Sequence, residues 1–190
     1  TDFEKKWGVH NTYNLMASSL AAYILGVKVE NLVKSIPELP QIKFRQEKVY
    51  ENRKMQIYND TAATSPDATI AAIMRFNYKK DNLVLITGGT DKELDFQEWA
   101  EIVKKHINPK SLFFLSGSAT EKMKSTLAWN TYNEFEDLKG CLEAAIKRVL
   151  ELKDKGVILF SSSSKSFEKF KNEFDRGEKF NTLLEEVLDG

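Results

Sequence analysis

Cysteine and histidine are scarce in this 190-residue chain, which has one cysteine, Cys141, and two histidines. One cysteine cannot form an intrachain disulfide, so a reducing compartment such as the cytoplasm is the simplest expectation. His10 and His106 lie far apart without a second ligand at metal-binding spacing, and no zinc site is indicated. No apolar run is long enough to span a membrane, and the first residues do not resemble a signal peptide.

An excess of charge of either sign is also missing. Lys and Arg total 28, Asp and Glu total 28, and the net charge is zero. A nucleic-acid surface needs a basic excess, so we expect neither a nucleic-acid nor a membrane partner. Hydrophobic residues make up 42% of the chain, enough for a core in one domain or in one domain plus part of another. The chain begins without methionine or a strand pattern, and we expect it to be a piece of a longer protein.

The first forty residues predict helices. Residues 11–25 are rich in Ala and Leu and predict a helix that ends at Gly26. Residues 29–36 predict a second short helix, closed by Pro37 and Pro40. The pattern changes after this point, so we expect a domain boundary near Pro40.

Strands and helices alternate over the rest of the chain. Residues 47–51 and 55–59 are strand-like and flank a turn-like segment, which predicts a hairpin. The alternation predicts an α/β fold with a mostly parallel sheet and helices on both of its faces. Further strands are expected at 83–87, 111–116, 129–135 and 156–161, and helices at 66–76, 95–107, 121–127, 136–153 and 166–188. Residues expected in the core include Cys141, Phe113, Phe114, Leu115, Phe167, Phe170 and Phe174.

Small and polar residues follow the predicted strands, at residues 59–61, 87–89, 116–118 and 161–164. Ligands of parallel sheets bind at the carboxyl ends of the strands, and short side chains let them approach backbone N–H groups. Ordinary turns between strands and helices have the same composition, so both interpretations stay open.

The loop at residues 60–64 separates a predicted strand from a predicted helix. Ser65 suits the N-cap, Pro66 the first helical position and Asp67 the first turn. A loop at a helix N-terminus is a good place for an anion or a nucleotide ribose, and without a ligand it is a well-capped turn. The buried face of this helix is expected to hold Ile70, Ile73 and Met74.

Four blocks of sequence, in order along the chain, resemble the Mur ligases of peptidoglycan synthesis. GVHNTYN (8–14) is similar to the family's G-x-H-N-x-x-N, and NDTAATSPDATIAAI (59–73) to its N-D-S-K-A-T-N and the helix that follows. ITGGTDKELDF (86–96) is similar to L-G-G-x-x-K-x-x-D-F. FSSSSKSFEKFKNEFDRGEKF (160–180) is similar to S-P-A-x-A-S-F-D-x-F-x-x-x-x-x-R-G-x-x-F. Within the family, the resemblance is to the branch that adds D-glutamate.

The resemblance implies that residues 1–43 are the C-terminal end of a central ATPase domain. Residues 44–190 would then be the Rossmann-like C-terminal domain, which brings the incoming amino acid and closes over the nucleotide. The sequence contains no G-K-[ST], so it has no P-loop, and it lacks the region in which the family holds magnesium and a carbamylated lysine. We therefore expect the chain alone to be inactive.

The implied reaction is ADP-forming ligation of D-glutamate to UDP-N-acetylmuramoyl-L-alanine by a cytoplasmic monomer. ATP is the implied nucleotide, with Mg²⁺ bound mainly by the missing central domain. One alternative is a Mur-type or folylpolyglutamate-type ligase for another amino acid, although the D-N-P-R block of the diaminopimelate-adding relatives does not occur. Another is a non-catalytic binding module that kept the fold.

Matched positions imply the nucleotide contacts. Asn11 and Asn14 resemble the asparagines that face the adenine; an N-cap and a surface amide are their ordinary alternatives. Arg45 matches an arginine that reaches the ATP phosphates, for which its planar fork is suited. Asp60 matches the aspartate that accepts hydrogen bonds from the ribose hydroxyls.

The implied amino-acid contacts come from three other blocks. Lys92 would pair with a carboxylate of D-glutamate, while Thr64 and Ser166 would donate hydrogen bonds. The backbone N–H of Phe167, expected at a helix start, would do the same. An ordinary exposed lysine is the alternative for Lys92.

The sequence departs from the family pattern at several of these positions. Ala62 replaces a lysine, and a charged hydrogen bond of that kind is worth roughly 1.5–3 kcal/mol. Lys165, next to Ser166 in the altered serine segment, is our hypothesis for a replacement charge. Phe44 stands in place of the histidine before Arg45. Glu173 and Phe174 reverse the family's Phe-Glu order, which puts the aromatic beside the glutamate site in doubt.

Overall fold

The computed structural model describes residues 2–189. The chain forms two compact units, Thr1–Gln41 and Ile42–Gly190. The outer limits of the predicted domains, residues 1 and 190, lie outside the described residues. Within the described part, no helix combines the length and apolar character needed to cross a bilayer.

The first unit is helical, as predicted. It consists of α1 (Asp2–Trp7), α2 (His10–Ile24), α3 (Val29–Ser35) and a short 3₁₀ turn (Ile36–Glu38). Gly26 follows α2 with φ +92°, a left-handed conformation that suits the predicted stop. No residue of α2 is buried.

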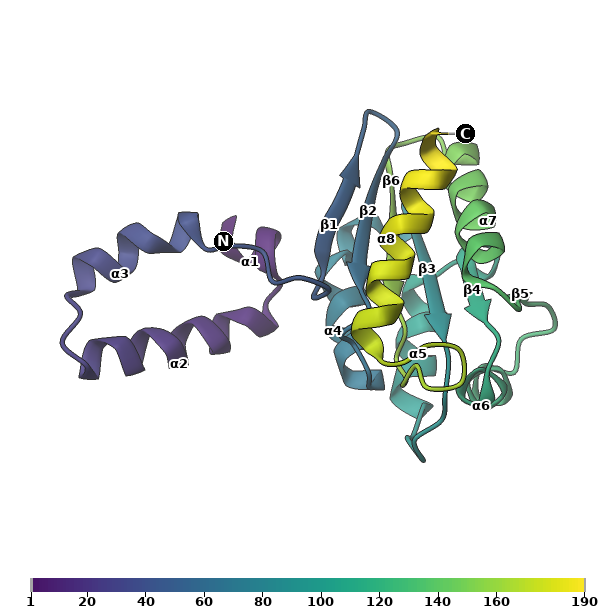
Figure 1. The fold of residues 1–190 in the computed structure, drawn as a ribbon, viewed down its shortest axis with the longest axis horizontal. Helices are drawn as coiled ribbons and strands as arrows, with labels where there is room; N and C mark the ends of the chain where they lie inside the picture. The colour runs from purple at the N-terminus through teal and green to yellow at the C-terminus, as the bar shows by residue number, and fades with distance from the viewer. Residues whose placement is uncertain (1, 190) are drawn as a thin grey trace. The chain divides into compact units, whose positions relative to one another are not determined.

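The second unit is built around a six-stranded sheet with strand order β1-β2-β6-β3-β4-β5 (Figure 1). β1 and β2 form the predicted antiparallel hairpin, and all the other neighbouring strands pair in parallel. The strands are β1 (Glu47–Glu51), β2 (Met55–Asp60), β3 (Leu83–Gly88), β4 (Leu112–Leu115), β5 (Asn133–Phe135) and β6 (Gly156–Ser161). The helices are α4 (Pro66–Arg75), α5 (Gln97–His106), α6 (Ser118–Leu127), α7 (Leu138–Glu151) and α8 (Glu173–Asp189), with 3₁₀ segments at Asn77–Asn82 and Pro109–Ser111.

Helices cover both faces of the sheet, which confirms the predicted α/β class. Successive strand residues point to opposite faces, so Leu83 and Leu85 join the core under α4, α5 and α6. Val84 and Ile86 join the core under α7 and α8. β3, β4 and β6 are buried along their whole length, as expected for central parallel strands. Cys141 is fully buried in the second core, also as predicted.

Several sequence expectations about element bounds and burial are wrong in detail. Residues 166–172 form a turn, and α8 begins only at Glu173. α6 is three residues longer at its start than expected, while β5 is confined to its last three residues. Met74 is 40% exposed, although Ile73 is buried and Ile70 packs against the core as expected. Phe167 and Phe174 are exposed rather than buried in the core.

Arg176, in the first turns of α8, is the most heavily bonded side chain at the sheet edge. Its side chain is fully buried, and burial lowers the pKa of the guanidinium to about 10. Nε donates to Thr61 Oγ1 at 2.7 Å, and Nη2 donates to Thr61 O at 2.9 Å and Ser164 O at 3.2 Å. Nη1 donates to Lys165 O at 3.1 Å. One side chain therefore ties α8 to the segments that follow β2 and β6.

Gly177 lets α8 approach the sheet closely. A Cβ at this position would lie 2.6 Å from both Phe44 Cδ1 and Thr61 Cγ2. The Gly177 carbonyl also accepts from Asn59 Nδ2 at 3.0 Å. The close approach brings Arg176 within reach of the strand ends.

Replacing the buried Arg176 should destabilise the second unit more than replacing an exposed arginine does. Arg176→Met leaves buried carbonyl groups without donors, and we expect a loss of about 3 kcal/mol or more in the free energy of unfolding. Arg53→Met, at the exposed hairpin turn, should change it by no more than about 0.5 kcal/mol. Urea unfolding of the 190-residue chain measures both; equal effects would contradict this role for Arg176.

Candidate functional site

The carboxyl ends of β2, β6, β3 and β4 meet at one edge of the sheet (Figure 1). Hydrogen bonds link the polar residues that follow these strands. Ser161 Oγ donates to Asp60 Oδ2 at 2.7 Å, and Gly88 N donates to Ser162 O at 3.1 Å. Ser162 Oγ donates to Ala63 O at 3.1 Å. The predicted set of polar strand ends therefore forms one connected edge.

Two glycines make the close contacts at this edge possible. Gly88 and Gly89 have φ of +114° and +134°, a region that L side chains rarely adopt. A Cβ would lie 2.3 Å from Leu115 O at Gly88 and 2.5 Å from Lys165 O at Gly89. Directly after them, Thr90 N donates to Lys165 O at 3.0 Å in an isolated antiparallel bridge.

These links bring together the three segments that carry the predicted amino-acid contacts. Lys92 is exposed two residues after the bridge, and Ser166 follows the bridging Lys165 directly. Thr64 is half-buried and follows Ala63, whose carbonyl is bonded to the segment after β6. A lysine and two hydroxyls thus lie on neighbouring segments of one edge.

Ser166 is the most informative of these residues. It is only 3% exposed, and its Oγ has no hydrogen-bond partner among residues 2–189. Buried hydroxyls are nearly always paired, whereas the Ser166 hydroxyl is free to form a further hydrogen bond. Phe167 next to it is 58% exposed and lies in a turn, so its N–H does not start a helix as the sequence predicted.

Asp60 ends β2 in a fully enclosed environment, with 2% of its surface exposed. Oδ1 accepts from Gln46 N at 2.9 Å, and Oδ2 accepts from Ser161 Oγ. Burial raises the pKa of this carboxyl to about 7, against the opposing effects of both hydrogen bonds and of Arg45 and Arg75. The carboxylate is thus held by the protein on both of its oxygens, a feature that the sequence did not predict.

The other predicted nucleotide residues fall into two places. Arg45 is exposed and lies next to Gln46, the residue that binds Asp60. Asn11 and Asn14 lie on α2 in the first unit, where Asn14 Nδ2 donates to Asn11 Oδ1 at 2.9 Å. Asn11 Nδ2 in turn donates to Trp7 O at 2.6 Å. The two asparagines are therefore neighbours on one helix.

Glu168 lies at the strand-end edge and was not identified from the sequence. Its Oε2 accepts from Ser118 N at 3.0 Å, and its Oε1 accepts from Ser118 Oγ. Its own N–H donates to Thr90 Oγ1 at 2.9 Å. These bonds attach the 166–172 turn to the N-terminus of α6, where a carboxylate is favoured by the helix dipole. The sequence feature that could have identified it is the acidic residue directly after Ser166 and Phe167 in the fourth block.

The residues that depart from the family pattern each contact a neighbour that the structure identifies. Ala62 N donates to Phe44 O at 2.9 Å, so the backbone there holds the loop before β1. Lys165 Nζ lies 5.4 Å from the centre of the Phe167 ring. Phe174 is exposed on α8, with its ring centre 6.2 Å from that of Phe44.

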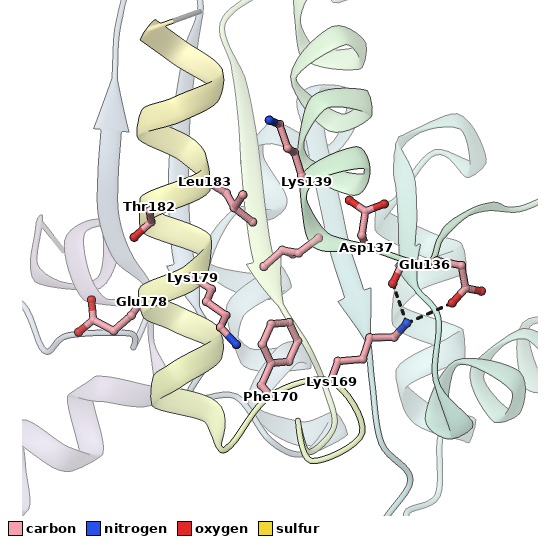
Figure 2. Close-up of a pocket in the computed structure, with 10 residues that line it drawn as sticks. Glu136, Asp137, Lys139, Lys169, Phe170, Glu178, Lys179, Thr182 and Leu183 are labelled. Carbon is pink, nitrogen blue, oxygen red and sulfur yellow. Dashed lines mark hydrogen bonds and ion pairs between the residues drawn. The ribbon is translucent and has the colours of Figure 1, made fainter.

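A separate cavity of about 660 Å³ lies between α7, α8 and the 166–172 turn (Figure 2). Lys169 closes one side, where Nζ donates to Glu136 O at 2.6 Å and Glu136 Oε2 at 3.2 Å. Leu138, Phe170 and Leu183 supply its apolar part. None of the sequence-predicted site residues lines it, so the candidate site remains the strand-end edge.

Sequence comparison finds close relatives although no protein-family model matches the chain. The chain is 34% identical over 181 residues to the UDP-N-acetylmuramoylalanine–D-glutamate ligase of Aquifex aeolicus, covering 94% of this chain and 41% of that protein. It is 33% identical over 183 residues to the enzyme of the same name from Roseiflexus, covering 94% and 38%. The chain thus spans about two fifths of the length of these curated relatives.

Solved structures show the same fold. The D-alanyl-D-alanyl-adding Mur ligase of Acinetobacter baumannii matches with TM-score 0.67 and 17% identity over 96% of this chain and 37% of that one. A pseudomurein peptide ligase type C from Methanothermus fervidus matches with TM-score 0.61 and 19% identity over 94% and 36%. The chain is therefore similar, over nearly its whole length, to part of the UDP-N-acetylmuramoylalanine–D-glutamate ligases, and it shares its fold with part of the two solved ligases.

Proposed function

We propose that this chain supplies the amino-acid-binding and closure domain of an ATP-dependent ligase that joins D-glutamate to UDP-N-acetylmuramoyl-L-alanine. The observation that carries the proposal is the edge on which Thr64, Lys92 and Ser166 lie on hydrogen-bonded segments. The names of the curated relatives supply the substrates. The ligase acts as a monomer in the cytoplasm, the compartment expected from the sequence.

In the proposed reaction, the carboxylate of the UDP-linked substrate is phosphorylated by ATP. The amine of D-glutamate attacks the resulting acyl phosphate, and phosphate leaves. This chain contributes by holding D-glutamate in position, because orientation of the attacking group can remove several kcal/mol from a barrier. Closure of the domain over the nucleotide excludes water from the acyl phosphate.

Each contact proposed for D-glutamate uses a group on the connected edge. Lys92 pairs with a substrate carboxylate, and its exposed position leaves the ammonium accessible. Ser166 donates through a buried hydroxyl that has no other partner among the described residues. Thr64 donates from the end of the loop before α4. The Phe167 N–H donates from a turn, without the help of a helix dipole.

The proposed nucleotide contacts come from the positions that match the family blocks. Arg45 binds the ATP phosphates, and Asp60 accepts from the ribose hydroxyls through lone pairs beside the two already engaged. Asn11 and Asn14 contact the adenine. Mg²⁺ is proposed to be bound mainly by the central domain of the parent enzyme.

We also propose that residues 1–43 end a central ATPase domain and that residues 44–190 are the C-terminal domain. The separation of compact units between Gln41 and Ile42 supports this assignment. Large apolar side chains exposed on α2 and α3 support it too, because such surface is usually covered by protein. They include Tyr13, Met16, Leu20, Tyr23, Ile24, Val29 and Val33.

A non-catalytic binding module is the second candidate. It is favoured by Ala62, which stands where the family has a lysine, and by the altered serine segment at residues 161–165. Lys165 lies beside Ser166 and remains our hypothesis for a compensating charge. Activity of the parent enzyme separates the two candidates.

The parent enzyme should release phosphate only when D-glutamate is supplied with magnesium ATP and UDP-N-acetylmuramoyl-L-alanine. L-glutamate, L-lysine and diaminopimelate are each supplied in turn in place of D-glutamate. Release with one of these instead would keep the ligase chemistry and overturn the specificity. No release with any of them would favour the non-catalytic module.

In the same assay, Lys92→Met should raise KM for D-glutamate by about tenfold to a hundredfold, because a charged hydrogen bond is lost. KM for ATP should stay near its original value. Lys147→Met, an exposed lysine on α7, is the matched control and should change neither constant. An unchanged KM for D-glutamate in Lys92→Met would contradict the contact.

The ionisation of Asp60 gives a stability prediction with a definite sign. Its folded pKa of about 7 lies above the ordinary aspartate value of 3.8, so the folded state holds a proton that the unfolded state has lost between these pH values. The free energy of unfolding should therefore fall as pH rises to about 7, by roughly 2–3 kcal/mol between pH 5 and pH 8.

The side chain in Asp60→Asn cannot ionise, so the free energy of unfolding of this variant should not show the decrease that Asp60 causes between pH 5 and pH 8. Urea unfolding of the 190-residue chain at the two pH values measures the difference between wild type and variant. Asp154→Asn, an exposed residue just before β6, is the control and should follow the wild type. A wild-type profile that matches Asp60→Asn would show that Asp60 titrates normally.

A further inference from the structure

The turn that carries Arg45 has an unusual backbone. Phe44 and Gln46, on either side of it, have φ of +62° and +47°. Left-handed conformations are uncommon for residues other than glycine and cost energy, so they persist only where the surroundings hold them. Two such residues, one on each side of an exposed arginine, indicate that neighbouring elements hold the backbone of this turn.

Gln46 is held from two elements. Its N–H donates to Asp60 Oδ1 at 2.9 Å, at the end of β2. Its backbone carbonyl and its Oε1 both accept from Arg75 Nη1, at 3.2 Å each. Arg75 ends α4, and its guanidinium carbon lies 5.1 Å from the Tyr58 ring centre and 4.9 Å from that of Phe76. The aromatic rings hold the guanidinium in place, and the guanidinium holds Gln46.

Phe44 is held on the other side of the turn. Its N–H donates to Glu47 Oε2 at 2.9 Å, and its carbonyl accepts from Ala62 N at 2.9 Å. Its ring is buried against Gly177. Both neighbours of Arg45 are thus buried and bonded, whereas Arg45 itself is exposed. The bonds on both sides therefore fix the backbone of the turn, and with it the direction of the Arg45 Cα–Cβ bond.

We propose that Arg75 and Asp60 are positioning residues that hold this turn and so preorganise the Arg45 guanidinium for a phosphate group. The proposal rests on the proposed function only in taking that phosphate to be part of ATP. It adds a role to Asp60 besides the ribose contact and gives one to Arg75, which the family blocks do not include. A guanidinium fork gains from preorganisation because less side-chain freedom is lost when phosphate binds.

The first test is a double-mutant cycle on KM for ATP in the parent enzyme. Arg75→Gln should raise KM for ATP by about tenfold when Arg45 is present. In an Arg45→Ala background, it should raise KM by less than about twofold, because the group that Arg75 positions has gone. Asp60→Ala should raise KM in both backgrounds, since it also removes the ribose contact, but by a smaller factor when Arg45 is absent. Effects of full size in that background would overturn the proposal. The constants for D-glutamate should not change in Arg75→Gln.

The second test does not depend on activity. In the 190-residue chain, ¹⁵N relaxation should give the Arg45 and Gln46 amides order parameters near those of β2, about 0.85. Arg75→Gln should lower both toward about 0.6, while Arg53→Gln, at the exposed hairpin turn, should leave both unchanged. Amides that stay rigid in Arg75→Gln would overturn the proposal even if the parent enzyme proves active.

The two tests separate the possible failures. A parent enzyme without phosphate release would refute the proposed function, and the relaxation measurement would still decide the positioning role. Arg75→Lys guards against misfolding, because it keeps the charge above the two rings but loses the planar fork. It should unfold at the wild-type temperature and show intermediate order at Gln46. Wild-type order at Gln46 in Arg75→Lys would count against the proposal.

Discussion

The buried guanidinium of Arg176 is the interaction on which the functional edge depends. It replaces water with three backbone carbonyls and one hydroxyl, all in the segments that follow β2 and β6. Because α8 carries Arg176, the packing of this helix and the shape of the edge form one structural unit. Gly177 makes the close approach possible, since any side chain there would collide with Phe44 and Thr61. A cation buried in this way is costly unless its hydrogen bonds are complete, so the segments have little freedom to rearrange.

This constraint fixes the geometry of the edge of short polar residues that we propose as a binding surface. The Lys165 carbonyl serves both Arg176 and the bridge to Thr90, so the strand-end segments are fixed relative to one another. The fixed backbone leaves the Ser166 hydroxyl buried and unpaired within the described part of the chain. Lys92 is exposed two residues after the Thr90 bridge. A ligand with a carboxylate and acceptor groups would complete both, which is the chemistry that we propose for D-glutamate.

Much of the fold could be predicted because its signals are local. Alternating strand and helix patterns gave the sheet class, and the run of residues 51–54 gave the hairpin. The 166–172 turn could not be predicted, because its helix-like composition is overridden by Glu168 binding Ser118, fifty residues away in sequence. For the same reason the enclosure of Asp60 was missed: it depends on Gln46 and Ser161, which only the folded sheet brings together. Three of the sequence blocks contain Thr64, Lys92 and Ser166, which the structure puts on neighbouring segments of one edge, while their contacts with substrate stay predictions.

Amide hydrogen exchange at Gly88 and Thr90 tests whether Arg176 holds the strand-end segments in place. Their N–H groups donate to Ser162 O and Lys165 O, the bonds that join β3 to the segment held by Arg176. In the 190-residue chain we predict protection close to that of the core amides of β3. Arg176→Lys should remove this protection while Leu85 stays protected, since the core strand pairing does not involve Arg176. Rapid exchange at Gly88 and Thr90 in the wild type, or equal protection in Arg176→Lys, would show that Arg176 does not fix these segments.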